Sequence, residues 1–284
     1  MILTGFEVAH ALEFVEASHL ARQVAMFRSL TQRDDAYALN VCGGMAALTD
    51  RVFGRKLNHV TGLGMGATVD AEAIRQLEDA YHVRALDVEI DVCPHADPST
   101  LAVLSARGYT VNAFSNTYVR GLEGDDVDLP PPDGVEIVTD RSIVDGLFVP
   151  NSVAAFETQA TPRPRVLLET LAKIALARTD TTRFIALLDG RVAGTAGVSV
   201  IDSPMGKVAH LYIASTHPAY RGRGVQLALI RARLAAARAA GCVMASVTAR
   251  AQNVSARNTE RAGFALAYTK ATFAKPYARP VDGR

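Results

Sequence analysis

The sequence predicts an α/β (α+β) fold with two domains, each a mixed, mostly antiparallel sheet flanked by helices. Three observations lead to this prediction. The chain has 284 residues, which is about twice the length of a typical domain. Short runs of alternating apolar residues are interleaved with stretches of helical periodicity. An acidic, proline-rich segment separates two halves that both end in a short helix, a glycine and an aromatic residue.

The segment between the halves is residues 123–134, EGDDVDLPPPDG. Its three consecutive prolines donate no backbone hydrogen bonds and favour an extended spacer. We therefore expect a first domain at residues 1–122, a linker at 123–134 and a second domain at 135–284.

The second half gives the clearer order of elements. Asp189-Gly190 joins two apolar runs and is typical of a tight hairpin turn, because both turn residues need a positive φ. Gly241 is typical of a helix end. In chain order we expect a strand at 135–139, helices at 142–156 and 165–177, the hairpin, a strand at 208–216, a helix at 225–240, a strand at 243–248, a helix at 255–262 and a strand at 264–273.

The first half is less regular. Its last helix and strand repeat the end of the second half, because Arg107-Gly108-Tyr109 resembles Ala262-Gly263-Phe264, and this repeat suggests two copies of one fold. The expected elements are a helix at 6–29, a strand at 36–41, a turn at Gly43-Gly44 into residues 45–50, a helix at 69–81, a strand at 86–92, a helix at 99–107 and a strand at 109–122.

Charge and composition exclude several classes of protein. Lys and Arg minus Asp and Glu gives 10 − 19 = −9 for residues 1–134 and 20 − 10 = +10 for the rest, so the second half should attract anions. Aromatic residues are too sparse, and basic residues too scattered along the helices, for nucleic-acid binding.

No apolar run reaches the ~18 residues of a membrane span. The first ten residues lack a basic segment before an apolar stretch, so we expect a cytoplasmic location. The three cysteines have no CxxC spacing, which argues against a disulfide framework or a metal site.

The segment with the most chemical information is Thr216–Gln226, THPAYRGRGVQ. A strand ends there, a glycine-containing loop follows, and a helix begins. The first backbone N–H groups of a helix have no partner within it, and the positive end of the helix dipole favours an anion. Gly222 and Gly224 allow close approach, and Arg221 and Arg223 add positive charge. These features predict a phosphate-binding loop.

Here the sequence resembles the GNAT superfamily of acetyl-CoA-dependent N-acetyltransferases. Arg221–Gln226 approaches the family signature [QR]-x-x-G-x-[GA], although Gln226 replaces the final small residue. Asn253–Phe264 matches the downstream pattern of an asparagine and a short helix ending in G-F. The resemblance covers about residues 135–275, and residues 1–122 look like a degenerate copy without the phosphate loop.

The resemblance implies that acetyl-CoA is the cosubstrate, that no metal is needed, and that a small-molecule primary amine accepts the acetyl group. Together with the composition, this leads us to expect no nucleic-acid or membrane partner, and a monomer or homodimer. By the same resemblance the loop would hold the pyrophosphate, the preceding strand would hold the pantetheine arm, and two asparagines would lie near the thioester. The implied cofactor-binding residues are Thr216, Arg221, Gly222, Arg223, Gly224, Val225, Gln226, Asn253 and Asn258.

Amine acetylation needs a proton acceptor and an acid for the leaving thiolate. His210 is the candidate base, because some family members carry a glutamate base at this place on the strand and an imidazole suits the task. Strand alternation predicts that it shares a face with Thr216. The family often has a tyrosine acid at the position of Thr259. Tyr212 is our tentative substitute, with Tyr220, Tyr268 or water as alternatives.

Three other features favour ordinary structural roles. Gly62–Gly66, GLGMG, follows no clear strand and is interpreted as a flexible turn. His95 and Asp97 lie between prolines and are interpreted as solvated turn residues. His59 is interpreted as a loop residue. A second class of function remains open, a catalytically silent acyl-CoA-binding or scaffold protein, because Gln226 and Thr259 depart from the family pattern.

Overall fold

The computed structural model describes residues 4–124, 130–158, 162–250 and 254–277. The backbone contacts divide the chain into two compact units. The C-terminal unit comprises Asn116–Ala267, and the N-terminal unit comprises Thr4–Ser115 together with the described residues from Tyr268 onward. Each unit has its own apolar core. Among the described helices, none is both long and apolar enough to cross a membrane.

In the C-terminal unit the strands follow the order β5-β10-β9-β8-β7-β6. Neighbouring strands are antiparallel except β9 and β10, which are parallel. The elements are β5 (Thr110–Gly121, from Asn116 on), β6 (Val135–Val138), α4 (Arg141–Glu157), α5 (Arg165–Ala177), β7 (Thr181–Leu188), β8 (Arg191–Ser203), β9 (Gly206–Thr216), the 3₁₀ turn η3 (Pro218–Tyr220), α6 (Val225–Ala239), β10 (Met244–Ala249), α7 (Val254–Arg261) and the first residues of β11 (Ala265–Lys275).

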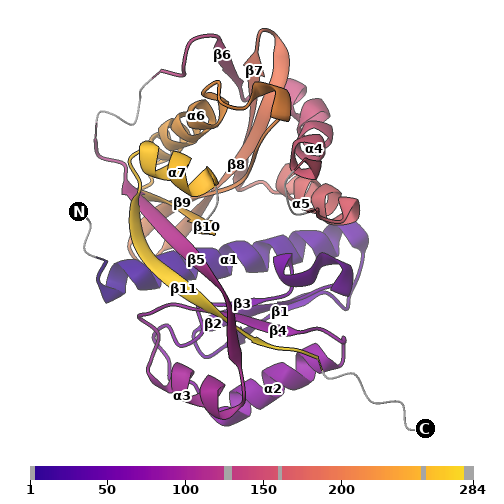
Figure 1. Cartoon of the computed structure of the whole chain (residues 1–284), viewed down its shortest axis with the longest axis vertical. Coiled ribbons are helices and arrows are strands. Elements are labelled where there is room, and N and C mark those ends of the chain that lie inside the picture. Colours follow the sequence, from indigo (N-terminus) through magenta and orange to yellow (C-terminus); the bar gives the residue numbers. More distant parts are fainter. Residues whose placement is uncertain (1–3, 125–129, 159–161, 251–253, 278–284) are drawn as a thin grey trace. The chain divides into compact units, whose positions relative to one another are not determined.

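Helices cover both faces of this sheet (Figure 1). On one face, Val225 and Leu229 of α6 pack in one apolar cluster with Leu211 of β9. On the other face, Phe148 of α4 packs in a second cluster with Ile185 of β7 and with residues of α5. The central strands β7, β8 and β9 are therefore covered by helices on both faces and hold the loops at their ends.

In the N-terminal unit the strands follow the order β1-β2-β3-β4-β11. Here β3 and β4 are the parallel pair, and the other described pairs are antiparallel. The elements are α1 (Phe6–Thr31), β1 (Tyr37–Val41), β2 (Gly44–Leu48), the 3₁₀ segment η1 (Arg51–Lys56), β3 (Val60–Thr61), α2 (Ala71–His82), β4 (Val88–Val92), α3 (Ser99–Ala106), the first residues of β5 and the last residues of β11.

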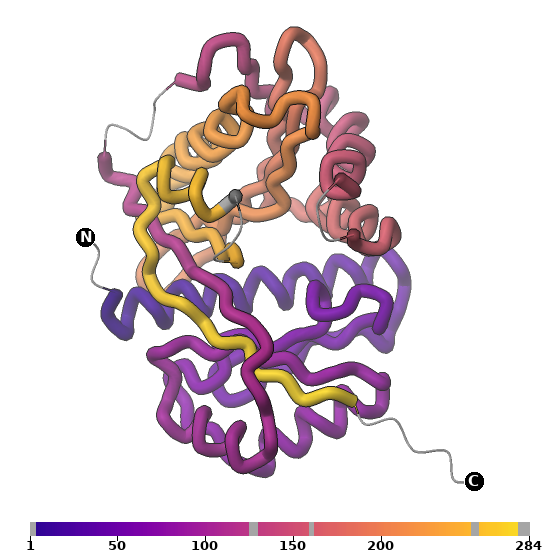
Figure 2. Tube along the Cα trace, in the orientation of Figure 1, coloured from indigo at the N-terminus to yellow at the C-terminus, as the bar shows by residue number. Residues whose placement is uncertain are grey.

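Two strands each contribute residues to both units, as the continuous trace of β5 and β11 shows (Figure 2). Asn116–Gly121 of β5 pair with β10 in the C-terminal unit. Ala271–Lys275 of β11 pair with β4 in the N-terminal unit. The units therefore differ from the expected ranges 1–122 and 135–284, because ladder hydrogen bonds between distant segments decide which strand joins which sheet.

Several expected elements are confirmed. Asp189 and Gly190 have φ of 52° and 71°, and they join strands that pair at Leu188 and Arg191. The helix expected at 165–177 is α5, with the same bounds. The local sequence was sufficient to predict this turn and this helix, because the backbone conformation of each is set mainly by residues adjacent along the chain.

Paired charges lie buried in the N-terminal unit. Asp91 of β4 is 2% exposed; it contacts the guanidinium of Arg55 and accepts a hydrogen bond of 2.7 Å from the Thr272 hydroxyl of β11. Burial acts to raise the pKa of Asp91, but the positive charges of Arg55 and Lys270 outweigh it and lower the pKa to about 2. Asp91 is therefore an anion at neutral pH.

This lowered pKa predicts a stability effect of Asp91→Asn. A carboxyl whose pKa is lower in the folded than in the unfolded protein adds stability above its unfolded pKa, near 3.9, and loses it as the pH falls to its folded value. We expect the variant to lose roughly 2 kcal/mol at pH 7 and to show a flatter decline between about pH 4 and pH 2. Urea unfolding across this range measures both. Asp34→Asn, at a side chain 93% exposed, is the control; an equal loss in the control would contradict the prediction.

Candidate functional site

The parallel strands β9 and β10 pair over a short stretch only. Their register runs from Val208↔Met244 to His210↔Ser246, whereas β9 continues to Thr216 and β10 to Ala249. Past His210 and Ser246 the two strands no longer pair, and β10 keeps its partner β5 on the other side. An opening in the sheet therefore begins at His210 and Ser246.

A β-bulge in β9 lies next to this opening. Thr195 pairs with Ser215 and Gly197 pairs with Tyr212, so β9 has one residue more than β8 across this stretch. Ile213 lies in the bulge with a φ of 47°, which is rare for a β-branched residue and often marks a functional site.

The bulge overturns one sequence expectation. Alternation along a regular strand predicts that His210 and Thr216 share a face. The extra residue reverses the alternation, so His210 shares a face with Ser215, and Thr216 lies on the opposite face with its partner Gly194. The prediction was wrong because the sequence gives no sign of the bulge: Ile213 has a positive φ, which isoleucine rarely adopts.

His210 is 7% exposed and lies at the start of the opening. Its Nδ1 is 3.2 Å from the hydroxyl oxygen of Ser246. The Tyr212 ring lies 6.3 Å away between centroids, with an angle of 22° between the ring planes. The candidate base is thus held by neighbours on its own strand and on β10.

Tyr212, the tentative acid, is part of a polar network. Its hydroxyl lies 2.8 Å from the hydroxyl of Thr181, and the guanidinium of Arg178 lies 5.8 Å from its ring centre. Arg178 is paired with Asp180 at 2.7 Å and donates to Ser199 at 2.9 Å. Burial raises the pKa of Tyr212, so the phenol stays protonated at neutral pH and is a weaker acid than an ordinary tyrosine.

The other candidate acids lie in different surroundings. Tyr220 is in η3, with its ring 6.1 Å from that of His217. Tyr268 belongs to the N-terminal unit, where it donates a 2.7 Å hydrogen bond to Glu13; burial raises its pKa far above the usual range. Thr259 is 2% exposed.

The predicted phosphate loop connects β9 to α6. Gly222 and Gly224 have φ of 76° and 79°, a region that disfavours other residues. A Cβ on Gly224 would lie 2.9 Å from Pro132, so a side chain would not fit. Gly224 is the N-cap of α6, and the helix start receives no side-chain cap. The loop therefore presents the start of a 15-residue helix without a capping side chain, which suits an anion.

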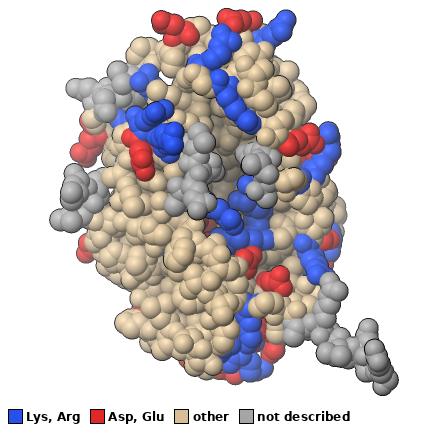
Figure 3. Space-filling view, in the orientation of Figure 1, with Lys and Arg blue, Asp and Glu red and all other residues tan. Residues whose placement is uncertain are grey.

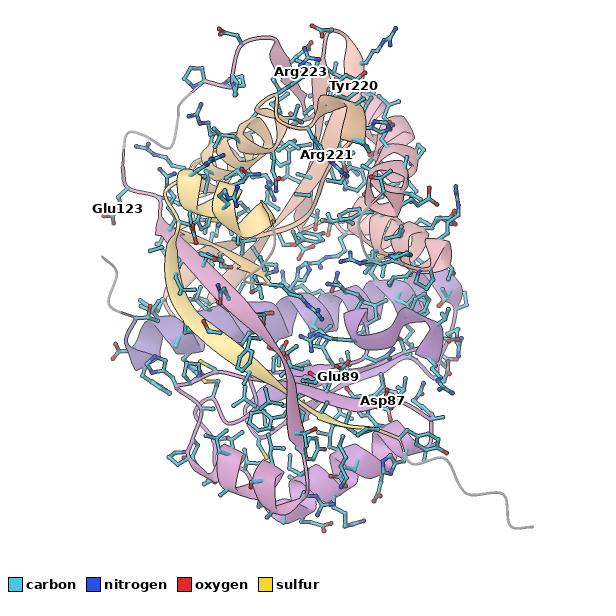
Figure 4. All side chains as sticks on the ribbon, viewed as in Figure 1. Asp87, Glu89, Glu123, Tyr220, Arg221 and Arg223 are labelled. Carbon is cyan, nitrogen blue, oxygen red and sulfur yellow. The ribbon has the colours of Figure 1, made fainter. Side chains whose placement is uncertain are left out.

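Two arginines extend from this loop. Tyr220, Arg221 and Arg223 gather there (Figure 4), and basic side chains lie exposed over this part of the unit (Figure 3). Arg221 donates to the Thr158 hydroxyl at 2.9 Å, and Arg223 pairs with Asp189 at 3.1 Å with about half of its side chain exposed. These are surface contacts of the kind that cost little to exchange for a bound anion.

The remaining predicted binding residues differ in their surroundings. Val225 is buried in the core, so only its backbone remains for a ligand. Gln226 accepts a 2.8 Å hydrogen bond from the side-chain amide of Asn258, which joins the first turn of α6 to α7. The hydroxyl of Thr216 is buried and has no hydrogen-bond partner among the described residues. Asn253 lies outside the described residues.

The N-terminal unit contains a corresponding strand, loop and helix. The GLGMG segment was expected to follow no strand, but it directly follows β3, a strand of only two residues, and α2 comes next along the chain. The start of α2 is capped by a carboxylate, because Asp70 accepts a 2.7 Å hydrogen bond from the Ala73 N–H. A carboxylate at that position repels an anion, in contrast to the glycine cap of α6.

Three other residues of the N-terminal unit were interpreted as structural. Asp97 is hydrogen-bonded to the backbone N–H of Ser99, and the His95 ring is edge-on to Tyr268. Burial lowers the pKa of His59 to about 4, so this imidazole is neutral at pH 7. Within the described ranges, no group of three or more His, Cys, Asp or Glu side chains could hold a metal ion.

The mixed sheet, the opening between the parallel strands and the glycine-capped helix start define an α/β protein whose β9–α6 connection has a helix start suited to an anion. Residues 151–264 match the model of the acetyltransferase (GNAT) family. This part of the chain is therefore similar to the acetyltransferase domains of that family. The family match supports a transferase.

Solved structures share the fold of nearly the whole chain. A GCN5-related N-acetyltransferase from Kribbella flavida is 16% identical, with a TM-score of 0.60 over 96% of this chain and 98% of that one. A tandem GNAT protein from the clavulanic acid biosynthesis pathway is 14% identical, with a TM-score of 0.61 over 95% and 98%. A GCN5-related N-acetyltransferase from Sphaerobacter thermophilus is 16% identical, with a TM-score of 0.56 over 84% and 78%. At these identities the likeness shows the fold. Comparison with curated proteins gives no match.

Proposed function

We propose that the protein is an acetyl-CoA-dependent N-acetyltransferase that acetylates a primary amine of a small molecule. One observation carries the proposal: a glycine-capped helix start is joined by the η3 loop to β9, the strand that also bears His210 where β9 and β10 separate. An anion site and a proton acceptor on one βα unit are what acyl transfer from a phosphorylated thioester to an amine requires.

The chain's residues would divide the work as follows. The backbone of residues 222–226 would accept the pyrophosphate, with Arg221 and Arg223 as counter-charges. Backbone groups of β9 near Thr216 would hold the pantetheine arm, and the unpartnered hydroxyl of Thr216 would gain a partner. The hydrogen bond between Gln226 and Asn258 would fix the α7 side of the loop. When bound, acetyl-CoA supplies an activated acetyl group, and His210 would take the proton that the amine loses.

The direct test is release of free CoA when the full chain is mixed with acetyl-CoA and a library of small primary amines. Transfer is supported if at least one amine gives CoA release together with an acetylated product by mass spectrometry. Tight acetyl-CoA binding with no product from any amine would support the silent acyl-CoA-binding alternative, which Gln226 at the helix start motivates.

The loop assignment predicts the effect of Arg221→Glu. This change removes an attractive charge from the loop and adds a repulsive one, so acetyl-CoA affinity should fall by about tenfold or more. Titration calorimetry measures the affinity. Arg165→Glu is the matched control, because Arg165 is an exposed arginine of the same unit on α5. Equal affinities of the Arg221→Glu variant and the unmodified chain would place the phosphates elsewhere.

A further inference from the structure

We propose that Ser246 is a positioning residue for His210: its hydroxyl oxygen accepts a hydrogen bond from Nδ1–H and so fixes the tautomer in which Nε2 is the basic nitrogen that takes the proton of the amine. The proposal rests on the proposed function, in which His210 is the base. It assigns to β10 a role that the sequence pattern did not reveal.

The geometry places the two side chains as a pair. Ser246 and His210 are register partners in the parallel β9–β10 ladder, so their side chains lie on the same face of the sheet. Both are buried, at 3% and 7% exposure. The hydroxyl oxygen lies 3.2 Å from Nδ1, which is within hydrogen-bond range for an imidazole nitrogen. They form the last described register pair before the strands separate.

The hydrogen bond matters because a neutral imidazole has one protonated and one unprotonated nitrogen. The partner of one nitrogen decides which tautomer is present, and so decides which nitrogen can accept a proton. If Nδ1–H donates to Ser246, Nε2 is the basic atom. When Nε2 takes the amine proton, both nitrogens carry hydrogen and the Nδ1–H bond to Ser246 persists, so the ring keeps its orientation during the transfer.

The surroundings suit an acceptor role for the Ser246 hydroxyl. A serine oxygen has two lone pairs and can accept from Nδ1–H in either protonation state of the ring. Tyr212, the nearest titratable side chain on the same strand, is protonated at neutral pH and is held by Thr181. Arg178 lies over the Tyr212 ring, and its positive charge is paired with Asp180.

The first arm of the test is the tautomer itself, measured on the full chain. Histidine-selective ¹⁵N labelling gives ring-nitrogen spectra of all seven histidines, and His210→Gln assigns the His210 signals. We expect Nδ1–H in the unmodified chain and a larger Nε2–H population in Ser246→Ala. A predominant Nε2–H tautomer in the unmodified chain, or no change in Ser246→Ala, would overturn the proposal. This readout needs no turnover, so it separates the proposal from the proposed function.

The second arm is kinetic. Ser246→Ala should lower kcat by about tenfold and change the acidic limb of the pH profile, with the KM for acetyl-CoA nearly unchanged, whereas Ser246→Thr, which keeps a hydroxyl, should restore most of kcat. Ser152→Ala is the control, because Ser152 is a buried serine on α4 whose hydroxyl has no described partner. Equal kinetics of Ser246→Ala and Ser152→Ala would also overturn the proposal. If the unmodified chain acetylates no amine, the proposed function fails and the tautomer measurement alone decides the role of Ser246.

Discussion

Replacing His210 with alanine is expected to lower turnover by about 10² to 10⁴-fold while acetyl-CoA affinity stays nearly unchanged. The reason is its place in the sheet: His210 lies at the point where β9 and β10 cease to pair, whereas the predicted phosphate loop begins after Thr216 at the end of β9. The acidic limb of the pH profile should also disappear, because that limb reports protonation of the base. Initial-rate assays of CoA release from about pH 5.5 to about pH 9 measure both the loss of turnover and the loss of the acidic limb.

His82→Ala is the control for this experiment. His82 ends α2 in the N-terminal unit, and its ring is edge-on to Tyr277, so its loss should leave turnover and the pH profile unchanged. Wild-type turnover in His210→Ala across the same pH range would make His210 a structural residue. The amine proton would then pass to water or to another group.

The predictable part of the site was the part that depends on local sequence. Asp189-Gly190 could be predicted as a turn because few residues tolerate a positive φ at both positions. The strand-to-helix loop from Arg221 to Gly224 could be predicted because two closely spaced glycines tolerate the positive φ that such a turn requires; that it binds phosphate stays a prediction. Both features concern the backbone conformation of residues that are adjacent along the chain, so local sequence was enough to indicate them.

The missed parts depend on distant contacts or on rare conformations. The bulge at Ile213 could not be predicted, because isoleucine rarely has a positive φ and no neighbouring glycine marks the position. The role of Ser246 depends on its register with His210, 36 residues away. The last residues of β11 could not be assigned to the N-terminal unit, because strand pairing is decided by the whole sheet.

The pairing of β11 with β4 also buries a lysine in the N-terminal unit, which the sequence did not indicate. Lys270 of β11 is fully buried, with its ammonium 2.6 Å from a carboxylate oxygen of Glu16 and 3.2 Å from one of Glu13. Burial acts to lower the pKa of Lys270, but the negative charges of Glu13 and Glu16 outweigh it and raise the pKa above its ordinary value. Glu13 also accepts hydrogen bonds from Tyr268 and from the backbone N–H of Gly62.

Lys270→Met is therefore expected to destabilise the protein by about 3–5 kcal/mol, because it leaves the buried carboxylate of Glu13 without its positive partner. The melting temperature should fall on the order of 10 °C. Arg28→Ala is the control, since its exposed pair with Asp34 should contribute no more than about 1 kcal/mol. The double variant Lys270→Met with Glu13→Gln should recover part of the loss, because it removes the stranded charge as well. A melting temperature of Lys270→Met within a degree or two of the unmodified chain would mean that the carboxyl of Glu13 is already protonated in the folded protein.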